Sequence, residues 1–317
     1  MDARHPCFNA SAGDQWGRIH LPVAPDCNIS CAYCNRKTDC LNESRPGVCS
    51  RTLTPEEAAY LVDKAVRQMP SLAVAGIAGP GDPLANPEST LRTFELVRRR
   101  HPGLLLCLST NGLMLADYMA DLQALGVGHI TVTINAVIPA VARHIYSNVR
   151  ANGRSHHGLK AAEIILNKQE KALAAAERHG VTLKVNTVVI PGVNDEHVED
   201  IAHFAARFRV GLMNCIGLIP VRGTPMSSFT APTAKRMDEL RKRAGKHVPQ
   251  MRHCMRCRAD AFGPLSRDSR IENMLNARQY ALSSLCASSQ DNKCEFRETL
   301  IYSLEGALSP QTPPAGA

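Results

Sequence analysis

Short apolar runs alternate with longer amphipathic stretches along most of the chain, which is the pattern of strands and helices in βα units. Runs rich in Val, Ile or Leu predict six strands, at residues 19–24, 72–78, 104–109, 129–134, 183–190 and 212–219. Helices are predicted between and after them, at residues 54–69, 86–100, 113–125, 137–149, 159–179, 196–207 and 231–246. Strands joined by helices form parallel sheets, so the order predicts an α/β fold, a partial (β/α)6 barrel like an incomplete TIM barrel.

The stretch 54–69 carries the clearest helix signals. Thr54 is a good N-cap, Pro55 stands at the first helical position, and Glu57 follows the cap by three residues, as in a capping box. Strand signals stop after a cysteine-bearing loop at 251–263. Beyond 265 we expect one more helix, at 270–285, and a disordered tail ending in SPQTPPAGA.

The chain has 317 residues, of which 44% are hydrophobic, and 37 Lys and Arg against 29 Asp and Glu give a net charge of +8. No apolar run approaches the roughly 18 residues of a membrane span, and the start MDARHPCFNA has no signal-peptide pattern. We therefore expect a cytoplasmic monomer without a membrane partner. Only 4% of residues are aromatic, and no basic block is interleaved with aromatic side chains, so the charge does not predict nucleic-acid binding.

Twelve cysteines are many for a cytoplasmic chain, where clustered thiols bind metals or carry redox chemistry rather than form disulfides. Cys27, Cys31 and Cys34 follow the first predicted strand with the spacing C-x3-C-x2-C. Three thiolates leave one iron of a [4Fe-4S] cluster open for another ligand. The alternative is a zinc loop completed by Cys40 or His20. The motif resembles that of the radical S-adenosylmethionine (SAM) superfamily, in which the open iron binds SAM.

Glycine and polar residues stand near the ends of the later strands, where a βα barrel carries its functional groups. They occur in AGPGDP after the second strand, STNG after the third, TINA after the fourth, and within the fifth. The resemblance implies SAM-binding roles for Tyr33, Gly79, Gly81, Asp82, Thr110, Asn111, Asn135 and Asn186. Each alone is weak, since a Thr-Asn-Gly sequence is also an ordinary turn, but their order after the cysteine loop supports the resemblance.

Further cysteines narrow the resemblance to one family. The strings HPC, CNISCAYCNRKTDC, NESRPG, AGPGDP and CMRCRADAFG resemble the NifB family, radical SAM enzymes that build the carbide-centred precursor of the nitrogenase cofactor. The resemblance implies two auxiliary [4Fe-4S] clusters that act as substrates, each with three protein ligands. One set would be Cys7, His20 and Cys107, and the other Cys40, Cys254 and Cys257. By residue type alone, His20 and Cys107 are more typical of a buried core, whereas the C-x2-C pair of Cys254 and Cys257 favours a metal or a cluster, with zinc as the alternative.

The reaction that the resemblance implies uses SAM twice: one molecule methylates a cluster sulfide, and a second supplies the 5'-deoxyadenosyl radical that takes hydrogen from that methyl. The carbon becomes a carbide as the two clusters fuse with one extra sulfur. Glu43 and Arg45 follow Cys40 closely and are candidates for transient ligation, proton transfer or charge neutralisation, although a surface ion pair is equally consistent. Arg258 and Asp260 are candidates to orient the last cysteine loop. Expected partners are an iron-sulfur cluster donor, an electron donor such as ferredoxin or flavodoxin, and a cofactor carrier or scaffold protein.

The predicted organisation is an N-terminal extension (1–17), the barrel (18–230), a C-terminal extension with the C-x2-C loop (231–264) and a helix with a tail (265–317). About 50 residues after Gly263 are too few for the carrier domain of some family members, so a stand-alone form is expected. Alternatives are another multi-cluster radical SAM enzyme, or a non-catalytic iron-sulfur or zinc protein. No role is predicted for four cysteines, which are Cys49, Cys215, Cys286 and Cys294.

Overall fold

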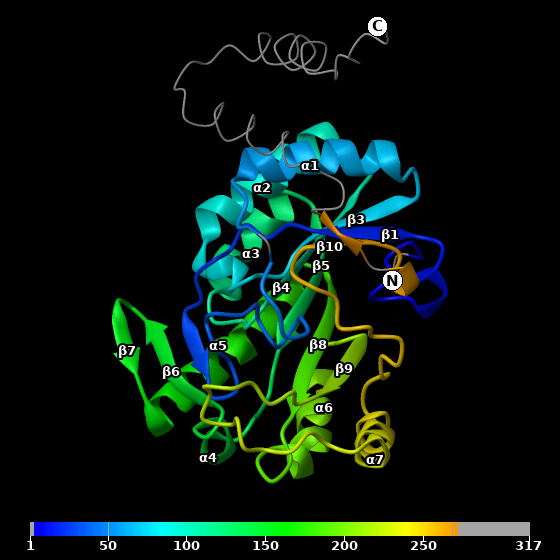
Figure 1. Cartoon of the computed structure of the whole chain (residues 1–317). Helices are drawn as coiled ribbons and strands as arrows, with labels where there is room; N and C mark the ends of the chain where they lie inside the picture. Colours follow the sequence, from blue (N-terminus) through cyan, green and yellow to red (C-terminus); the bar gives the residue numbers. More distant parts are fainter. Residues whose placement is uncertain (1–2, 50, 268, 272–317) are drawn as a thin grey trace, which may run out of the picture. The chain divides into compact units, whose positions relative to one another are not determined.

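Six parallel strands form the centre of the protein in a computed structural model that describes residues 3–49, 51–267 and 269–271. They lie side by side in chain order within an eight-stranded sheet. Their bounds are β1 (Gly17–His20), β3 (Leu72–Ile77), β4 (Leu105–Thr110), β5 (Val127–Thr133), β8 (Thr182–Val189) and β9 (Leu212–Gly217). All six predicted strands are present, and the expected partial (β/α)6 barrel is confirmed (Figure 1).

Helices connect the parallel strands. They are α1 (Pro55–Gln68), α2 (Pro87–Arg100), α3 (Leu115–Ala124), α5 (Gly158–Arg178) and α6 (Val198–Ala206), with α7 (Ala234–Ala244) after the last parallel strand. The predicted capping box starts α1: Thr54 Oγ1 accepts from the Glu57 amide at 3.2 Å, and the Thr54 amide donates to Glu57 Oε2 at 2.9 Å. Short 3-10 turns lie at Ala10–Ala12, Pro83–Ala85, Asp195–His197 and Leu265–Arg267. Among the described residues, no helix is long and apolar enough to cross a membrane.

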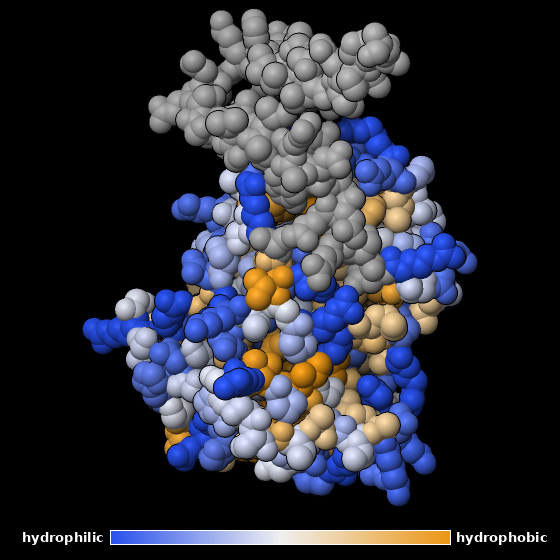
Figure 2. Space-filling view, in the orientation of Figure 1, coloured by the Kyte–Doolittle hydropathy of each residue, from blue (hydrophilic) through white to orange (hydrophobic). Residues whose placement is uncertain are grey.

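The predicted helix at 137–149 is wrong for most of its length. Only α4 (Pro139–Ala142) is helical, and the chain then forms the hairpin of β6 (Tyr146–Ala151) and β7 (Arg154–His156). The reason is tertiary: β6 pairs antiparallel with β2 (Ile29–Cys31), a strand that was not predicted. In Figure 1 the hairpin stands at the left edge, and in Figure 2 this region is covered by hydrophilic side chains.

The chain returns to its beginning after α7. Strand β10 (Ala261–Gly263) pairs antiparallel with β1, opposing Phe262 to Ile19, and β11 (Ser269–Arg270) extends that edge. Residues of the last cysteine loop therefore lie beside the N-terminal strand. The predicted helix at 270–285 and the predicted disordered tail lie outside the described residues.

Candidate active site

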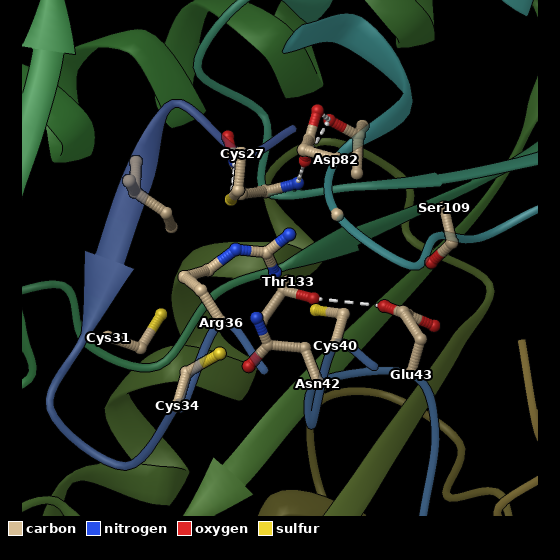
Figure 3. Close-up of a pocket in the computed structure, with 14 residues that line it drawn as sticks. Cys27, Cys31, Cys34, Arg36, Cys40, Asn42, Glu43, Asp82, Ser109 and Thr133 are labelled. Atoms are coloured by element: carbon tan, nitrogen blue, oxygen red, sulfur yellow. Dashed lines mark hydrogen bonds between the residues drawn. The ribbon is translucent and has the colours of Figure 1, made fainter. Parts of the chain in front are cut away.

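The first three cysteines surround a cavity at the carboxyl ends of the strands. Cys31 ends β2, and the chain turns there because the Cys34 amide donates to the Cys31 carbonyl at 2.9 Å. Cys27, Cys31 and Cys34 line an open cavity of about 390 Å3 (Figure 3). Arg36, which sequence reasoning missed, also lines the cavity, and its guanidinium donates to the Pro80 carbonyl at 3.4 Å. The cysteine loop is thereby attached to the turn that follows β3.

The buried carboxylate of Asp82 organises the opposite wall. Its Oδ1 accepts from the Leu84 amide at 2.9 Å, and its Oδ2 accepts from the Asn111 amide at 2.6 Å. Thr110 Oγ1 lies 3.0 Å from both carboxylate oxygens. Burial raises the pKa of Asp82, although these hydrogen bonds favour its charged form. Asp82, Thr110 and Asn111, all predicted SAM-binding residues, line the cavity together.

Gly81 allows the turn after β3 to approach the cysteine loop. A Cβ at this position would lie 2.0 Å from the Asp26 carbonyl oxygen, next to Cys27, and the Asp82 amide donates to that same oxygen at 2.7 Å. Any side chain would force the two segments apart. Gly81 lines the cavity, so its predicted contact with SAM stays a prediction beside this packing role.

The three thiols fit a cluster better than a single ion. Burial raises the pKa of Cys27 to about 12 and raises those of Cys31 and Cys34 as well, so iron binding must displace protons. Among the described residues, no three His, Cys, Asp or Glu side chains converge on one metal-ion position. A [4Fe-4S] cluster takes each thiolate on a different iron and needs no such convergence. Such a cluster, when bound, supplies the electron that cleaves SAM.

A second cavity, open to solvent and of about 710 Å3, adjoins the first and is lined by most of the predicted auxiliary ligands. Its lining includes Cys7, His20, Cys107, Cys254 and Cys257. The only predicted auxiliary ligand placed elsewhere is Cys40, which lines the first cavity and whose raised pKa reflects burial and then the neighbouring Cys34 and Cys27. The structure thus brings five of the six side chains together but does not reproduce the two sets of three.

A row of residues across the sheet forms the floor of the second cavity. His20 pairs in register with Gly76, and Gly76 pairs with Cys107 on the next strand. Because Gly76 has no side chain, space remains between the imidazole and the thiol. A Cβ on Gly76 would lie 3.5 Å from His20 Cδ2 and 3.7 Å from Cys107 Cβ. The row therefore leaves room for a group that both side chains can bind.

The tautomer of His20 suits a ligand. Its Nδ1 lies 3.0 Å from the Arg258 carbonyl oxygen, which can only accept, so Nδ1 carries the proton and Nε2 keeps its lone pair. Metal-binding histidines commonly donate their second nitrogen to a carbonyl in this way. Arg258 is itself fixed, because its guanidinium donates to both carboxylate oxygens of Asp260, at 2.8 and 3.2 Å. The predicted orienting pair, Arg258 and Asp260, is therefore in contact with His20 through the Arg258 carbonyl.

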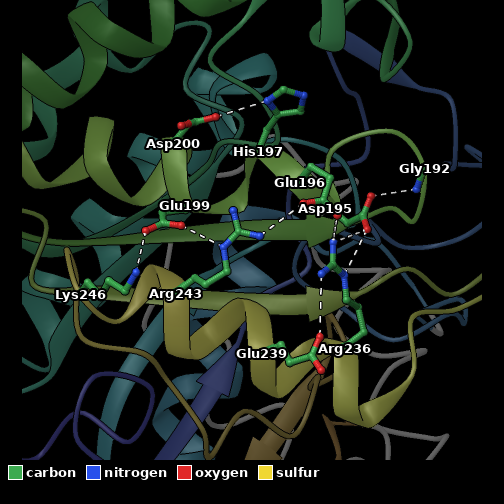
Figure 4. A network of polar contacts seen from close by, with 10 residues as sticks. All are labelled: Gly192, Asp195, Glu196, His197, Glu199, Asp200, Arg236, Glu239, Arg243 and Lys246. Carbon is green, nitrogen blue, oxygen red and sulfur yellow. Dashed lines mark hydrogen bonds and ion pairs between the residues drawn. The ribbon is translucent and has the colours of Figure 1, made fainter.

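Helix α7 directs the last cysteines toward the second cavity. Arg236 pairs with Asp195 at 2.8 Å and Arg243 with Glu199 at 2.9 Å, part of the network that links α7 to the start of α6 (Figure 4). After the helix, the Met251 amide donates to a backbone carbonyl of β9 at 2.7 Å. The segment with Cys254 and Cys257 follows, and the Arg18 guanidinium donates to Cys257 Sγ at 2.9 Å.

Glu43 belongs to both cavities, as do Asn42 and Ser109. Its carboxylate accepts from Thr133 Oγ1 at 3.0 Å and from Asn186 Nδ2 at 2.9 Å. Burial raises the pKa of Glu43, against the opposing effects of nearby Lys184 and these hydrogen bonds. A half-buried carboxyl that gains and loses a proton at higher pH than usual is suited to moving protons between the cavities.

Lys184 is a cavity residue that sequence reasoning missed. It is 6% exposed and lines the second cavity. Burial by itself lowers the pKa of Lys184, but Cys7, Glu43 and Cys107 raise it and outweigh burial, so the amine stays charged. Strand alternation puts Lys184 on the same face of β8 as Asn186, two residues later. Because Asn186 was a predicted site residue, this spacing was the available signal.

Other predicted site residues lie behind the cavities or at the surface. Tyr33 and Asn135 are buried and hydrogen-bonded to each other at 2.7 Å, and neither lines either cavity, nor does Gly79. Their roles in SAM binding stay predictions. Arg45 is exposed, and its amide donates to the Cys257 carbonyl at 3.3 Å.

Two of the cysteines without a predicted role are buried away from both cavities. Cys49 donates its amide to Asp39 at 3.0 Å, and Cys215 lies within β9. Burial raises the pKa of each thiol to about 12. Cys286 and Cys294 lie outside the described residues.

Comparison with known proteins shows which family this chain resembles. Residues 21–205 match the radical SAM superfamily. The FeMo cofactor biosynthesis protein NifB of Chlorobaculum tepidum is 44% identical over 96% of this chain and 70% of its own length, and that of Klebsiella pneumoniae is 44% identical over 84% and 58%. SuiB of Streptococcus suis shares the fold, with a TM-score of 0.51 at 11% identity over 74% of this chain and 48% of that one.

The chain thus spans between about half and 70% of the length of the curated relatives named here and others like them. The superfamily match covers more than half of this chain. It includes the cysteine loop and four of the six parallel strands, β3, β4, β5 and β8, and the two relatives extend the similarity over most of the described residues. The chain is therefore a member of the radical SAM superfamily and, within it, of the NifB family of FeMo cofactor biosynthesis proteins.

Proposed function

We propose that this protein is a radical SAM enzyme that fuses two [4Fe-4S] clusters around a SAM-derived carbide, with one extra sulfur, to make the eight-iron precursor of the nitrogenase cofactor. The observation that carries the proposal is the pair of adjoining cavities. One holds the three thiols of the C-x3-C-x2-C loop, and the other holds four more cysteine thiols and the imidazoles of His5 and His20. Membership of the NifB family supports the same reaction.

In this proposal the first cavity binds SAM beside the cluster of Cys27, Cys31 and Cys34. Asp82 holds the amides of the strand-end turns in place, so that Thr110 and Asn111 face the cavity. A preorganised wall of this kind lets the protein orient the methyl and ribose groups without rearranging.

The second cavity binds the substrate clusters. Cys7, Cys107, Cys254 and Cys257 offer thiolates, His20 offers Nε2, and the Lys184 ammonium offsets negative charge. The sixth ligand of the two sets, Cys40, lines the adjoining first cavity. A cluster with only three protein ligands, one of them an imidazole, is anchored loosely enough to leave as product. Glu43 accepts the protons that come off the methyl carbon, because its carboxylate faces both cavities.

The proposed partners follow from the same chemistry. The clusters come from an iron-sulfur cluster donor, the electrons from a low-potential carrier such as ferredoxin or flavodoxin, and the product goes to a carrier or scaffold protein. The proposed location is the cytoplasm, where a reducing environment preserves the free thiols.

Anaerobic reconstitution followed by iron counting and incubation with SAM tests the proposal. Three four-iron clusters give about twelve irons per chain, and the two uses of SAM release both S-adenosylhomocysteine and 5'-deoxyadenosine. An iron content near four, or release of only one of these products, would refute carbide formation and leave a simpler radical SAM enzyme.

Two variants distinguish the SAM cluster from the auxiliary clusters. Cys31→Ala removes a thiol of the first cavity and abolishes 5'-deoxyadenosine release. His20→Ala alters the spectrum of one auxiliary cluster and leaves the spectrum of the SAM cluster intact, because His20 lines only the second cavity. If His20→Ala instead changes no spectrum, the proposed role of the imidazole is wrong.

A further inference from the structure

A strongly basic surface stands beside the cysteine loop. We call residues 143–160, which include β6 and β7, the basic hairpin. It carries Arg143, Arg150, Arg154 and Lys160, all exposed, and the sequence has no Asp or Glu between positions 121 and 163. In Figure 2 the same region is hydrophilic, in the position that Figure 1 gives to β6 and β7.

The charges of the basic hairpin are hardly neutralised from within the protein. In the part of the chain that the structure describes, no carboxylate pairs with Arg143, Arg150 or Arg154. Lys160 lies 3.6 Å from Glu163, and both side chains are more than half exposed, so this pair screens little. A surface of one sign attracts and orients a partner of the opposite sign.

The basic hairpin is bound directly to the loop that carries the first three cysteines. Strand β6 pairs with β2, which opposes Tyr146 to Cys31. The Arg150 amide donates to the Asn28 carbonyl at 2.8 Å, and the Arg150 guanidinium donates to the Cys27 carbonyl. Strand β7 is two strands away from Cys31, about 10 Å at the usual spacing of a sheet. A protein seated on the hairpin would therefore lie next to the thiols of the first cavity.

We propose that the basic hairpin is the docking surface for an acidic one-electron carrier protein. This inference rests on the proposed radical chemistry, which needs one electron for each SAM that is cleaved reductively. The reduced carrier loses one electron to the cluster held by Cys27, Cys31 and Cys34, and that electron enters the sulfonium of SAM. The bond from sulfur to C5' breaks, giving methionine and the 5'-deoxyadenosyl radical, and the carrier leaves oxidised by one electron.

The features of the hairpin favour a protein over a nucleic acid. Its one Phe, Tyr or Trp residue, Tyr146, is 1% exposed, so the hairpin offers none of the large aromatic rings on which bases stack. Its bond to the cysteine loop places the charge where an electron must arrive, whereas nothing in the proposed chemistry requires a nucleic acid there.

The test compares two electron sources on the full-length, reconstituted protein. One is a reduced, acidic [2Fe-2S] ferredoxin, and the other is dithionite, a small reductant that needs no docking surface. The variant carries Arg143→Glu, Arg154→Glu and Lys160→Glu, and leaves Arg150 in place because it supports the loop. The matched control carries Lys171→Glu, Arg178→Glu and Lys242→Glu, three exposed cations outside the hairpin.

Release of 5'-deoxyadenosine is the readout. For the hairpin variant we expect KM for ferredoxin to rise at least about tenfold, and the ratio of ferredoxin-driven to dithionite-driven rate to fall accordingly. The control variant keeps the wild-type KM. For the wild type, KM for ferredoxin rises with salt, because screening weakens attraction between exposed charges.

An unchanged KM in the hairpin variant, or an equal rise in the control, overturns the proposal. If the Glu variant does not fold, the same three positions changed to Gln give a smaller rise in the same direction, and no rise in that variant also overturns it. Loss of duplex DNA binding in the hairpin variant with an unchanged KM for ferredoxin would identify a nucleic-acid surface instead. Because the readout is SAM cleavage alone, absence of an eight-iron product refutes the proposed function without affecting this test.

Discussion

A larger side chain at Gly76 would fill the space between His20 and Cys107. We expect it to block cluster loading without impairing folding. Gly76 is the second-last residue of β3 and is not one of the glycines with positive φ, so other residues fit its backbone. The contacts of an added Cβ, 3.5 Å to His20 and 3.7 Å to Cys107, are ordinary van der Waals distances. The two further methyl groups of Gly76→Val have to enter the space between the imidazole and the thiol.

The substitution is expected to change folding stability and iron content in opposite directions. Replacing glycine in a strand interior stabilises the folded chain by about 0.5–1 kcal/mol, because the unfolded chain loses conformational freedom. Loading of one auxiliary cluster is blocked, so iron falls by about four from a total of about twelve per chain. The variant is thus at least as stable as the wild type and binds less iron.

The assay pairs urea unfolding of the metal-free chain with iron counting after anaerobic reconstitution. Gly76→Ala is the matched control, because its single methyl stops at the Cβ position and leaves most of the gap open. Gly76→Val protein that loads the full complement of iron would refute the assignment of this row to a cluster. Equal iron loss in the Gly76→Ala variant would show that iron loading depends on the glycine backbone rather than on the space between His20 and Cys107.

Three further predictions concern the frame around the site. Asp82→Asn should cost about 2–4 kcal/mol in urea unfolding, because it breaks charge-assisted hydrogen bonds to a buried carboxylate, whereas Asp121→Asn at the surface should change stability by less than about 0.5 kcal/mol. The pKa of Cys215 is about 12 when folded and 9.0 ordinarily, so stability falls as pH rises from 9 toward 12; Cys215→Ala should remove about 1.4 kcal/mol per pH unit from that slope, and an unchanged slope would contradict the burial argument. Thr54→Ala should cost about 1 kcal/mol by removing the N-cap of α1, and a variant as stable as the wild type would show the cap to be unimportant.

The parallel strands were predictable because each is a short run of apolar residues between turn signals. Strands β2 and β6 were not, since each is held by the other: Cys31 opposes Tyr146, and neither stretch has a strong strand pattern of its own. The stretch 137–149 contains several residues that suit a helix, and only pairing across more than a hundred residues decides against it.

The candidate site was predictable as a set of residues rather than as a geometry. Strand ends pointed to Asp82 and Thr110, and both line the first cavity. No local pattern shows that Asn135 turns its amide away from that cavity to Tyr33, or that Lys184 faces a group of thiols. Those facts depend on which strands are neighbours and on how the final loop returns to β1.

Asn42, Glu43 and Ser109 form a wall with a cavity on each side. A substitution at any of these positions is in effect two substitutions, since it changes the shape and polarity of both chambers at once. If the proposed function holds, specificity for the methyl donor and for the metal cargo therefore cannot be adjusted independently there. Engineering of one cavity alone has to begin at side chains that line only that cavity, such as Arg36 in the first and Lys184 in the second.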